Sequence, residues 1–366
     1  MSKRILFHLG HPAHFHLFKN IIANLKKKGS YVYIAIKKKD ILEDLLVDSG
    51  FKYTNFLPSG RHDYKMGILW GMLKTDFRLL LFCLSKKVDL LVGTSYAISH
   101  VGKILGIPSI NINEDDWHIV PFYAKFSYPW ASVILAPKIS DTGKWEYKKI
   151  SYSGNHELSY LHPAVFTPDE AIVQKYVDIE KSYFVIRFAK LTAHHDTGIR
   201  GIDATVAEKI IEILKPYGRV IINTERDLEP QFEEYQININ PLDIHHIMAL
   251  ASLFIGDSQT MCAEAGVLGT PFIRFNDFVD RIGYLKELEQ NFELGFGFKP
   301  YQVESMLLKI KELVTDPQLK SKWQGKRNAM LEEKINVSQF MTWFIESYPE
   351  SLSIIKKNPD YQLKFK

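Results

Sequence analysis

The sequence predicts an α/β protein built from two Rossmann-like domains. Apolar segments of strand length alternate with amphipathic helices along most of the 366 residues, a pattern typical of parallel sheets covered on both faces. The pattern starts again after a polar segment with two prolines, residues 154–170, which marks a domain boundary. We therefore expect a first domain over residues 1–157, a second over 158–335, and a C-terminal helix and tail over 336–366 that pack back on the first. The carboxyl ends of the two sheets are expected to face a cleft.

Composition limits the class of function. A hydrophobic content of 46% and a charged content of 24% are those of a globular protein. The net charge of +4 is small and gives no reason to expect nucleic-acid binding. Cys83 and Cys262 each lie inside an apolar segment, which fits reduced, buried thiols and no zinc cluster. The first residues lack the pattern of a signal peptide, so we expect a cytoplasmic protein.

The most hydrophobic segment is residues 66–84. Lys74, Asp76 and Arg78 interrupt it, so a membrane-spanning helix is not expected. An amphipathic helix or helix pair fits better, with the apolar face packed on the sheet. Contact with the membrane interface is the alternative, which leaves open a peripheral location on the inner face of the membrane.

The first half contains strands and helices in alternation. The predicted strands are 4–9, 31–36, 53–56, 90–93, 133–137 and 150–154, and the predicted helices include 17–28 and 40–49. Residues 88–116 contain a strand, a helix, a Gly-Ile-Pro stop and a second strand. This order is that of a βαβ unit.

The second half repeats this organisation. Predicted strands are 183–188 and 219–223, predicted helices are 202–215, 243–251 and 300–315, and residues 320–347 are strongly helical. A further βαβ unit lies at 253–275, in which Asp257 or Ser258 suits the helix N-cap. Its helix begins directly after a strand, so its free N–H groups and its dipole favour a phosphate there. A βαβ unit without a ligand is the alternative.

Three histidines follow the first strand, in the loop Gly10–His16. Ligands bind at this end of the strands in open α/β sheets. No carboxylate or cysteine lies close in sequence, so we do not expect a metal site. A histidine there suits proton abstraction from a substrate hydroxyl, and a packed or capping histidine is the alternative.

Charged residues of the second half supply further candidates. Glu264 lies in the second turn of the helix of the 253–275 unit. There it could accept hydrogen bonds from both hydroxyls of a ribose, or simply compensate the helix dipole. Arg187, Lys190 and His195 could bind a diphosphate, with an ordinary surface loop as the alternative.

Glu114, Asp115 and Asp116 follow a strand of the first half. Together they resemble a site for a divalent cation. Three adjacent acids point in different directions, however, so we favour polar contacts to a sugar, or solvation.

Three segments carry a resemblance to a known family: GHPAHFHLFKNII (10–22), YSGNHELSYLHPAVFTPD (152–169) and GDSQTMCAEAGVLGTPFIR (256–274). They resemble the DUF354 family, which is related to UDP-N-acetylglucosamine 2-epimerase and to MurG-type glycosyltransferases. The third segment is the most specific, because it resembles the nucleotide-diphosphate motif DSGG…EEA of the epimerases. The resemblance implies a GT-B fold, with two Rossmann-like domains facing a cleft and a C-terminal helix crossing back to the first domain.

The same resemblance implies roles for the third segment. Asp257 and Ser258 fall on the Asp-Ser of the motif, and Glu264 falls on the glutamate that holds the ribose. Gln259 and Thr260 replace two glycines, so side chains stand where bare backbone would meet phosphate.

In the first half, His14 resembles the histidine with which MurG-like enzymes activate the acceptor. Glu114 falls on a catalytic glutamate of the epimerases. Thr94 replaces the epimerase aspartate, and of the epimerase His-Arg-Arg signature only Arg187 remains. These departures weigh against epimerisation.

The sequence thus favours a glycosyltransferase that transfers a sugar from a nucleotide-sugar donor, expected to be a UDP-sugar, to an acceptor hydroxyl. The acceptor would be a glycan or lipid-linked molecule of cell-surface glycan biosynthesis. The reaction is expected to be inverting and to need neither metal nor cofactor. The catalytic candidates are His14 and Glu114, and the nucleotide-sugar-binding candidates are Gly10, His11, Arg187, Lys190, Ser258, Gln259, Thr260 and Glu264. The alternatives are a 2-epimerase-like isomerase and a non-catalytic nucleotide-binding GT-B protein.

Overall fold

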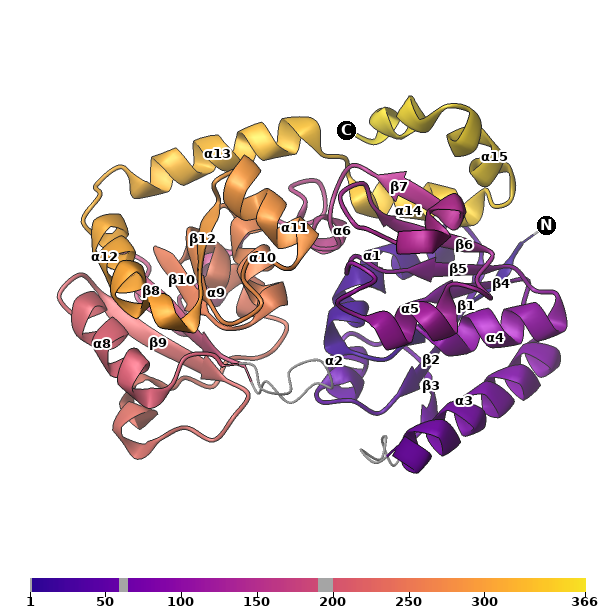
Figure 1. Ribbon diagram of the computed structural model, residues 1–366, viewed down its shortest axis with the longest axis horizontal. Coiled ribbons are helices and arrows are strands. Elements are labelled where there is room, and N and C mark those ends of the chain that lie inside the picture. Colours follow the sequence, from indigo (N-terminus) through magenta and orange to yellow (C-terminus); the bar gives the residue numbers. More distant parts are fainter. Residues whose placement is uncertain (1, 59–64, 190–199) are drawn as a thin grey trace. The chain divides into compact units, whose positions relative to one another are not determined.

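The computed structural model describes residues 2–58, 65–189 and 200–366 (Figure 1). The chain divides into two compact units. The first comprises Met1–Tyr160 and Ile335–Lys366, and the second comprises Leu161–Lys334. The ranges expected from the sequence were 1–157 with 336–366, and 158–335.

The first unit contains a seven-stranded parallel sheet in the order β3-β2-β1-β4-β5-β6-β7. Its strands are β1 (Arg4–Leu9), β2 (Tyr31–Lys37), β3 (Thr54–Leu57), β4 (Leu90–Gly93), β5 (Ser109–Ile112), β6 (Val133–Pro137) and β7 (Lys149–Tyr152). The predictions for β1, β4 and β6 are confirmed to the residue. Gly93 allows β1 and β4 to approach, because a Cβ there would lie 2.5 Å from the carbonyl oxygen of His8.

Helices cover both faces of this sheet (Figure 1). They are α1 (Pro12–Lys27), α2 (Leu42–Asp48), α3 (Lys65–Lys86), α4 (Tyr96–Leu105), α5 (Pro121–Ser127), α14 (Val337–Glu346) and α15 (Glu350–Lys357). The apolar segment at 66–84 lies within a single helix, α3. Its buried side packs on the sheet through Leu79 and Cys83.

Helix α1 begins at Pro12, five residues earlier than predicted from the sequence. Proline at the first helical position has a suitable φ, and its missing N–H costs nothing there. His11 is the N-cap, and its side chain accepts a hydrogen bond from the N–H of Ala13. His14 and His16 therefore lie on the helix, so the prediction of one loop with three histidines is wrong.

The second unit contains a five-stranded parallel sheet in the order β12-β11-β10-β8-β9. Its strands are β8 (Tyr183–Phe188), β9 (Arg219–Thr224), β10 (Leu253–Gly256), β11 (Phe272–Phe275) and β12 (Gly295–Phe298). Strand β12 was not predicted, since its sequence GFGF has two glycines. One of them, Gly295, leaves room for the ring of Phe272, which a Cβ would approach to 2.4 Å.

The longer helices of the second unit are α8 (Ala204–Leu214), α9 (Ile244–Leu250), α10 (Gln259–Leu268), α12 (Val303–Val314) and α13 (Leu319–Glu333). The predicted helical stretch 320–347 is interrupted between α13 and α14. There the N–H of Ile335 donates to the carbonyl of Ser153 at 2.9 Å, and Asn336 caps α14 by accepting from the N–H of Gln339.

Helix α14 packs against α1 in the first unit, as the predicted return of the chain requires. Phe340 is fully buried, with its ring 6.0 Å from Tyr152 and 5.7 Å from Phe365. The C-terminal region therefore completes the core of the first unit. Across the described ranges, no helix is both long enough and apolar enough to cross a bilayer.

Replacing Phe340 with alanine removes this buried ring. We expect Phe340→Ala to lower the free energy of unfolding by about 3–5 kcal/mol, because the cavity cannot fully collapse. Urea denaturation measures the change. Tyr301→Ala, at a side chain that is 75% exposed, is the matched control and should have little effect. An equally small effect at Phe340 would contradict the core role of α14.

Candidate functional site

Polar groups gather at the carboxyl ends of the strands in the first unit. Gly10 and His14 follow β1, Thr94 follows β4, Glu114 follows β5 and His156 follows β7. Because all these strands are parallel, their carboxyl ends lie on one edge of the sheet, where open α/β sheets bind ligands.

His14 is held by the two neighbouring strand ends. The N–H of Gly10 donates to Nδ1 at 3.1 Å, and Thr94 Oγ1 lies 2.7 Å from Nδ1 and 3.1 Å from Nε2. Burial, followed by the charges of His11 and Lys37, lowers the pKa of His14 well below its ordinary value. The ring is therefore neutral at pH 7, with both nitrogens engaged by the protein.

Glu114 contacts His156 through both of its carboxylate oxygens. One carboxylate oxygen, Oε2, accepts the backbone N–H of His156 at 2.9 Å, and the other, Oε1, lies 3.3 Å from Nδ1. The second ring nitrogen, Nε2, is buried and has no hydrogen-bond partner among the residues that the structure describes. A histidine that is oriented at Nδ1 by a carboxylate and has no hydrogen bond at Nε2 can accept a proton there.

His156 was missed as a candidate by the sequence analysis. It was read as part of the boundary segment 154–170, although it follows a predicted strand, as His14 and Glu114 do. The charge of His156 also contributes to the lowered pKa of His14, which places both imidazoles in one electrostatic cluster. Polarity directly after a strand was the signal available in the sequence.

Glu114 and Asp116, two of the three adjacent acids, contact different segments. Asp116 is buried and accepts the N–H of Asp141 at 2.7 Å, whereas Glu114 holds His156. Burial, together with the negative charge of Glu114, raises the pKa of Asp115 to about 7. Over the described ranges, no three His, Cys, Asp or Glu side chains are grouped so that they could hold a metal ion.

Gly10 and His11 build the start of α1. A Cβ on Gly10 would lie 2.7 Å from Cε of Lys37, so the lysine side chain crosses this position at close range. His11 caps the helix through Nδ1. Their predicted contact with a nucleotide-sugar stays a prediction.

In the second unit, α10 follows β10 as the sequence analysis expected. Ser258 is the N-cap, with Oγ 3.4 Å from the N–H of Met261. The side chain of Gln259 turns to Arg274, whose guanidinium is fully buried and donates to it at 2.7 Å. Glu289 holds the same guanidinium through two hydrogen bonds of 2.7 and 3.0 Å. The side-chain amide of Gln259 is therefore held by a buried guanidinium.

Asp257 is not the N-cap. Its carboxylate accepts the N–H groups of Ala189 at 2.6 Å and Ile202 at 3.2 Å, residues that border the 190–199 segment. Burial raises the pKa of Asp257 to about 6, even though these donors favour the charged form. Lys190 and His195, two candidates from the sequence, lie outside the described residues.

Arg187 is the second-to-last residue of β8, the strand that pairs with β10. Its guanidinium donates to Asn223 and Glu225, so this candidate for binding the diphosphate is paired with a carboxylate in the structure.

Glu264 lies one turn into α10, is 4% exposed, and accepts a hydrogen bond from His245 Nε2 at 3.0 Å. The side chains of Arg187 and Glu264 are thus each oriented by hydrogen bonds to neighbouring segments. Thr260, next to Gln259, is half-buried in the first turn of α10.

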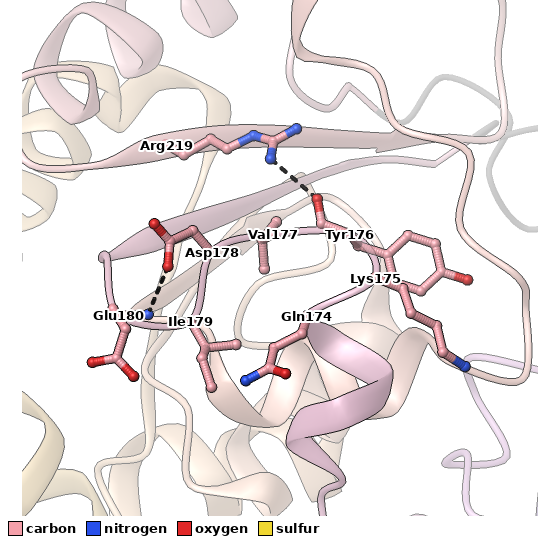
Figure 2. A pocket seen from close by; sticks show the side chains of 8 residues that line it. All are labelled: Gln174, Lys175, Tyr176, Val177, Asp178, Ile179, Glu180 and Arg219. Carbon is pink, nitrogen blue, oxygen red and sulfur yellow. Dashed lines mark hydrogen bonds between the residues drawn. The ribbon is translucent and has the colours of Figure 1, made fainter.

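A surface pocket of about 410 Å³ lies elsewhere in the second unit, lined by residues 174–180 and Arg219 (Figure 2). Arg219 is the first residue of β9, so the pocket lies at the amino ends of the strands. Figure 2 shows the Arg219 guanidinium donating to the carbonyl of Tyr176, at 3.1 Å. Ligands of open α/β sheets bind at the opposite edge, so the pocket is separate from the candidate site.

Comparison with solved structures defines the class. UDP-N-acetylglucosamine 2-epimerase from Neisseria meningitidis, bound to UDP-N-acetylglucosamine, is 14% identical with a TM-score of 0.67, covering 96% of this chain and 100% of that one. The enzyme of that name from Methanocaldococcus jannaschii, in complex with UDP-N-acetylglucosamine and UDP, is 16% identical with a TM-score of 0.62, covering 90% and 99%. The calicheamicin glycosyltransferase CalG4 is 12% identical with a TM-score of 0.61, covering 96% and 100%. The chain therefore has the two-domain α/β fold of the GT-B class, as predicted.

The family is shown by sequence. Residues 4–278 match the model of DUF354, a family described as "protein of unknown function", and the chain belongs to that family. Comparison with curated proteins finds no match. The resemblance noted from the three sequence segments is thereby confirmed.

The raised pKa of Asp115 predicts a pH effect on stability. A carboxyl whose pKa in the folded state lies above its ordinary value favours folding while it is protonated, and this contribution is lost as the pH rises from about 4 through about 7. We therefore expect Asp115→Asn to raise the melting temperature by a few degrees above about pH 7. The gain should vanish near pH 4. Calorimetry across this range measures it.

Asp360→Asn is the matched control, because Asp360 is an exposed aspartate of the same unit. It should leave the melting temperature unchanged at every pH. A gain at Asp115 that does not depend on pH would contradict the account.

Proposed function

We propose that the protein is a glycosyltransferase that transfers a sugar from a nucleoside diphosphate sugar, a UDP-sugar by preference, to an acceptor hydroxyl. The observation that carries the proposal is the Glu114–His156 pair at the carboxyl edge of the first sheet. An imidazole that is oriented by a carboxylate at Nδ1 and has no hydrogen bond at Nε2 can remove the proton from an alcohol in such a reaction. In this proposal a glycan or lipid-linked molecule of cell-surface glycan synthesis supplies the hydroxyl.

The first unit would activate the acceptor. His156 Nε2 takes the proton, Glu114 stabilises the imidazolium that forms, and His14, neutral and bonded to Thr94, helps to orient the hydroxyl. The geometry favours His156 over His14 as the base, because the protein engages both nitrogens of His14. The acceptor oxygen forms a bond to the anomeric carbon as the bond from that carbon to the diphosphate breaks. The configuration inverts, and the nucleoside diphosphate leaves.

The second unit would bind the donor. The start of α10 offers N–H groups and the positive end of its dipole to the diphosphate, with Ser258, Gln259 and Thr260 around it. Glu264, which His245 already orients, is proposed to accept hydrogen bonds from the ribose hydroxyls. Arg187 and Lys190 would neutralise the leaving diphosphate, so the proposal requires no metal ion or cofactor. The solved neighbours bound to UDP or UDP-N-acetylglucosamine support this choice of nucleotide.

A 2-epimerase-like reaction on a UDP-sugar is the second candidate. The likeness to two epimerase structures favours it. Thr94 occupies the place of an epimerase aspartate, which weighs against it. Incubation with UDP-N-acetylglucosamine and no acceptor separates the two, since only the epimerase reaction yields N-acetylmannosamine or its UDP form. Binding of donors without turnover of any would support a non-catalytic nucleotide-binding protein.

A thermal-shift screen against UDP-, GDP-, CMP- and dTDP-sugars identifies the donor, because a ligand that binds only the folded state raises its melting temperature. We expect a UDP-sugar to give the largest shift. No shift with any nucleotide sugar would remove the basis of the proposal.

For the donor site, we expect Glu264→Ala to weaken UDP binding by roughly tenfold or more, since two hydroxyls lose a charged acceptor. Calorimetric titration of UDP measures the affinity. Glu304→Ala, at an exposed glutamate of the same unit, is the control. Unchanged UDP affinity in Glu264→Ala would remove Glu264 from the site.

For the base, we expect His156→Gln to lower kcat by about a hundredfold or more while donor affinity is retained. Glu114→Ala should also lower kcat and leave the donor KM unchanged, because Glu114 acts through His156. His118→Gln, at an exposed histidine of the same unit, controls for a general effect of the substitution. Full activity of His156→Gln, together with a loss in His14→Gln, would return the base role to His14.

A further inference from the structure

The outer side of α3 is a stripe of large apolar side chains. Its members are Trp70 (67% exposed), Leu73 (52%), Phe77 (62%), Leu81 (50%) and Leu84 (57%). Their spacing of three or four residues places them along one side of the helix. The opposite side is buried, so the stripe is not the part of α3 that forms the core.

The neighbouring helices also carry exposed apolar side chains. Helix α3 packs against α4, and α4 packs against α5 (Figure 1). These two helices and the turn after them add Ile104 (66%), Phe122 (52%), Phe126 (41%) and Trp130 (48%). We call these four residues and the five of α3 the α3–α5 face. Nine exposed large apolar side chains on three helices that pack on one another, or in the turn after them, indicate an interaction surface.

His100 ties the three helices together. From α4, its Nδ1 lies 2.8 Å from Asp76 of α3, and its Nε2 lies 2.7 Å from the carbonyl of Phe126 in α5. Burial lowers the pKa of His100, but the hydrogen bond and charge of Asp76 outweigh it, so the net shift is upward. The face is therefore held as one surface.

The charge of the three helices is strongly one-sided. Their basic residues are Lys65, Lys74, Arg78, Lys86, Lys103 and Lys125. The acidic residue among them is Asp76, which is paired with His100. Lys74, Lys103 and Lys125 are exposed. Exposed apolar side chains and exposed lysines on the same three helices complement a surface that is apolar beneath and anionic at its boundary.

We infer that the α3–α5 face binds the surface of a membrane that contains anionic lipids. The apolar side chains enter the boundary between headgroups and acyl chains, and the lysines contact the lipid phosphates. Trp70 and Trp130 suit this boundary, because each indole has an apolar body and an N–H donor. At 22 residues α3 is about 33 Å long, so its stripe can lie along the plane of the membrane.

The positive charge of helices α3, α4 and α5 also favours an anionic membrane over a second copy of the chain as the partner of the α3–α5 face. Pairing two such faces would bring like-charged lysines together without acidic partners, which disfavours association. The inference does not depend on the proposed transferase reaction. Membrane binding and donor turnover are measured separately, so either can fail alone.

The test is co-sedimentation of the full chain with two kinds of vesicle, phosphatidylcholine alone and phosphatidylcholine mixed with phosphatidylglycerol. We expect binding to the mixed vesicles that weakens with salt, and much weaker binding to phosphatidylcholine alone. The double variant F77S/L81S should reduce the partition coefficient roughly tenfold or more, because two inserted apolar side chains are lost.

The matched control is Y301S/L308S in the second unit. It removes two apolar side chains that are 75% and 70% exposed, outside the proposed face. This variant should bind vesicles like the unaltered protein. Circular dichroism checks that both variants are folded, and their exposed positions make loss of folding unexpected.

Two further measurements address the lysines and the tryptophans. Lys74→Glu and Lys125→Glu should each weaken binding to the anionic vesicles by about fivefold or more, since each basic residue near such a surface contributes about 1 kcal/mol. Brominated lipids should quench the tryptophan fluorescence of the unaltered protein. The W70F/W130F variant should lose most of this quenching.

The inference is overturned if the protein does not bind anionic vesicles, or if F77S/L81S binds as tightly as Y301S/L308S. It is also overturned if analytical ultracentrifugation without lipid shows a dimer that F77S/L81S dissociates. That result would assign the face to a second copy of the chain.

Discussion

The candidate chemistry depends on the parallel alignment of the strands. Parallel pairing brings the carboxyl ends of β1, β4, β5 and β7 to one edge of the first sheet, so residues far apart in sequence become neighbours. His14 meets Thr94 across 80 positions, and Glu114 meets His156 across 42. Gly93 allows β1 and β4 to approach as this requires, because a Cβ there would meet the carbonyl oxygen of His8 at 2.5 Å.

In the second unit the same alignment orients the start of α10. The buried Arg274–Glu289 pair holds Gln259, and the buried Asp257 carboxylate holds the backbone on both sides of the 190–199 segment. Buried charges of this kind need several hydrogen bonds to offset their desolvation. Here those hydrogen bonds hold the residues around the proposed diphosphate site.

The sequence allowed the fold to be predicted well, because hydrophobic periodicity records burial directly. Continuous apolar runs identified β4 and β6, and Ser258 and Gly269 correctly bounded α10. The start of α1 was misplaced because a histidine is an unusual N-cap. Strand β12 was missed because its glycines lower strand propensity, and its place depends on the ring of Phe272, which no local pattern records.

The site was harder to predict, since its contacts join distant segments. The sequence singled out His14, Glu114 and Glu264 but did not predict their contacts with Thr94, His156 and His245. The apolar face of the 66–84 segment was expected to pack on the sheet, with contact to the membrane interface as the alternative. Only the exposed fractions of its side chains showed that the helix carries two apolar sides with different surroundings.

The most direct test of the central claim is a crystal structure of the protein with UDP bound. The account predicts the diphosphate at the start of α10, beside Ser258 and Thr260, and the ribose hydroxyls on Glu264. A nucleotide at the other edge of the sheet, in the pocket lined by residues 174–180 and Arg219, would contradict it.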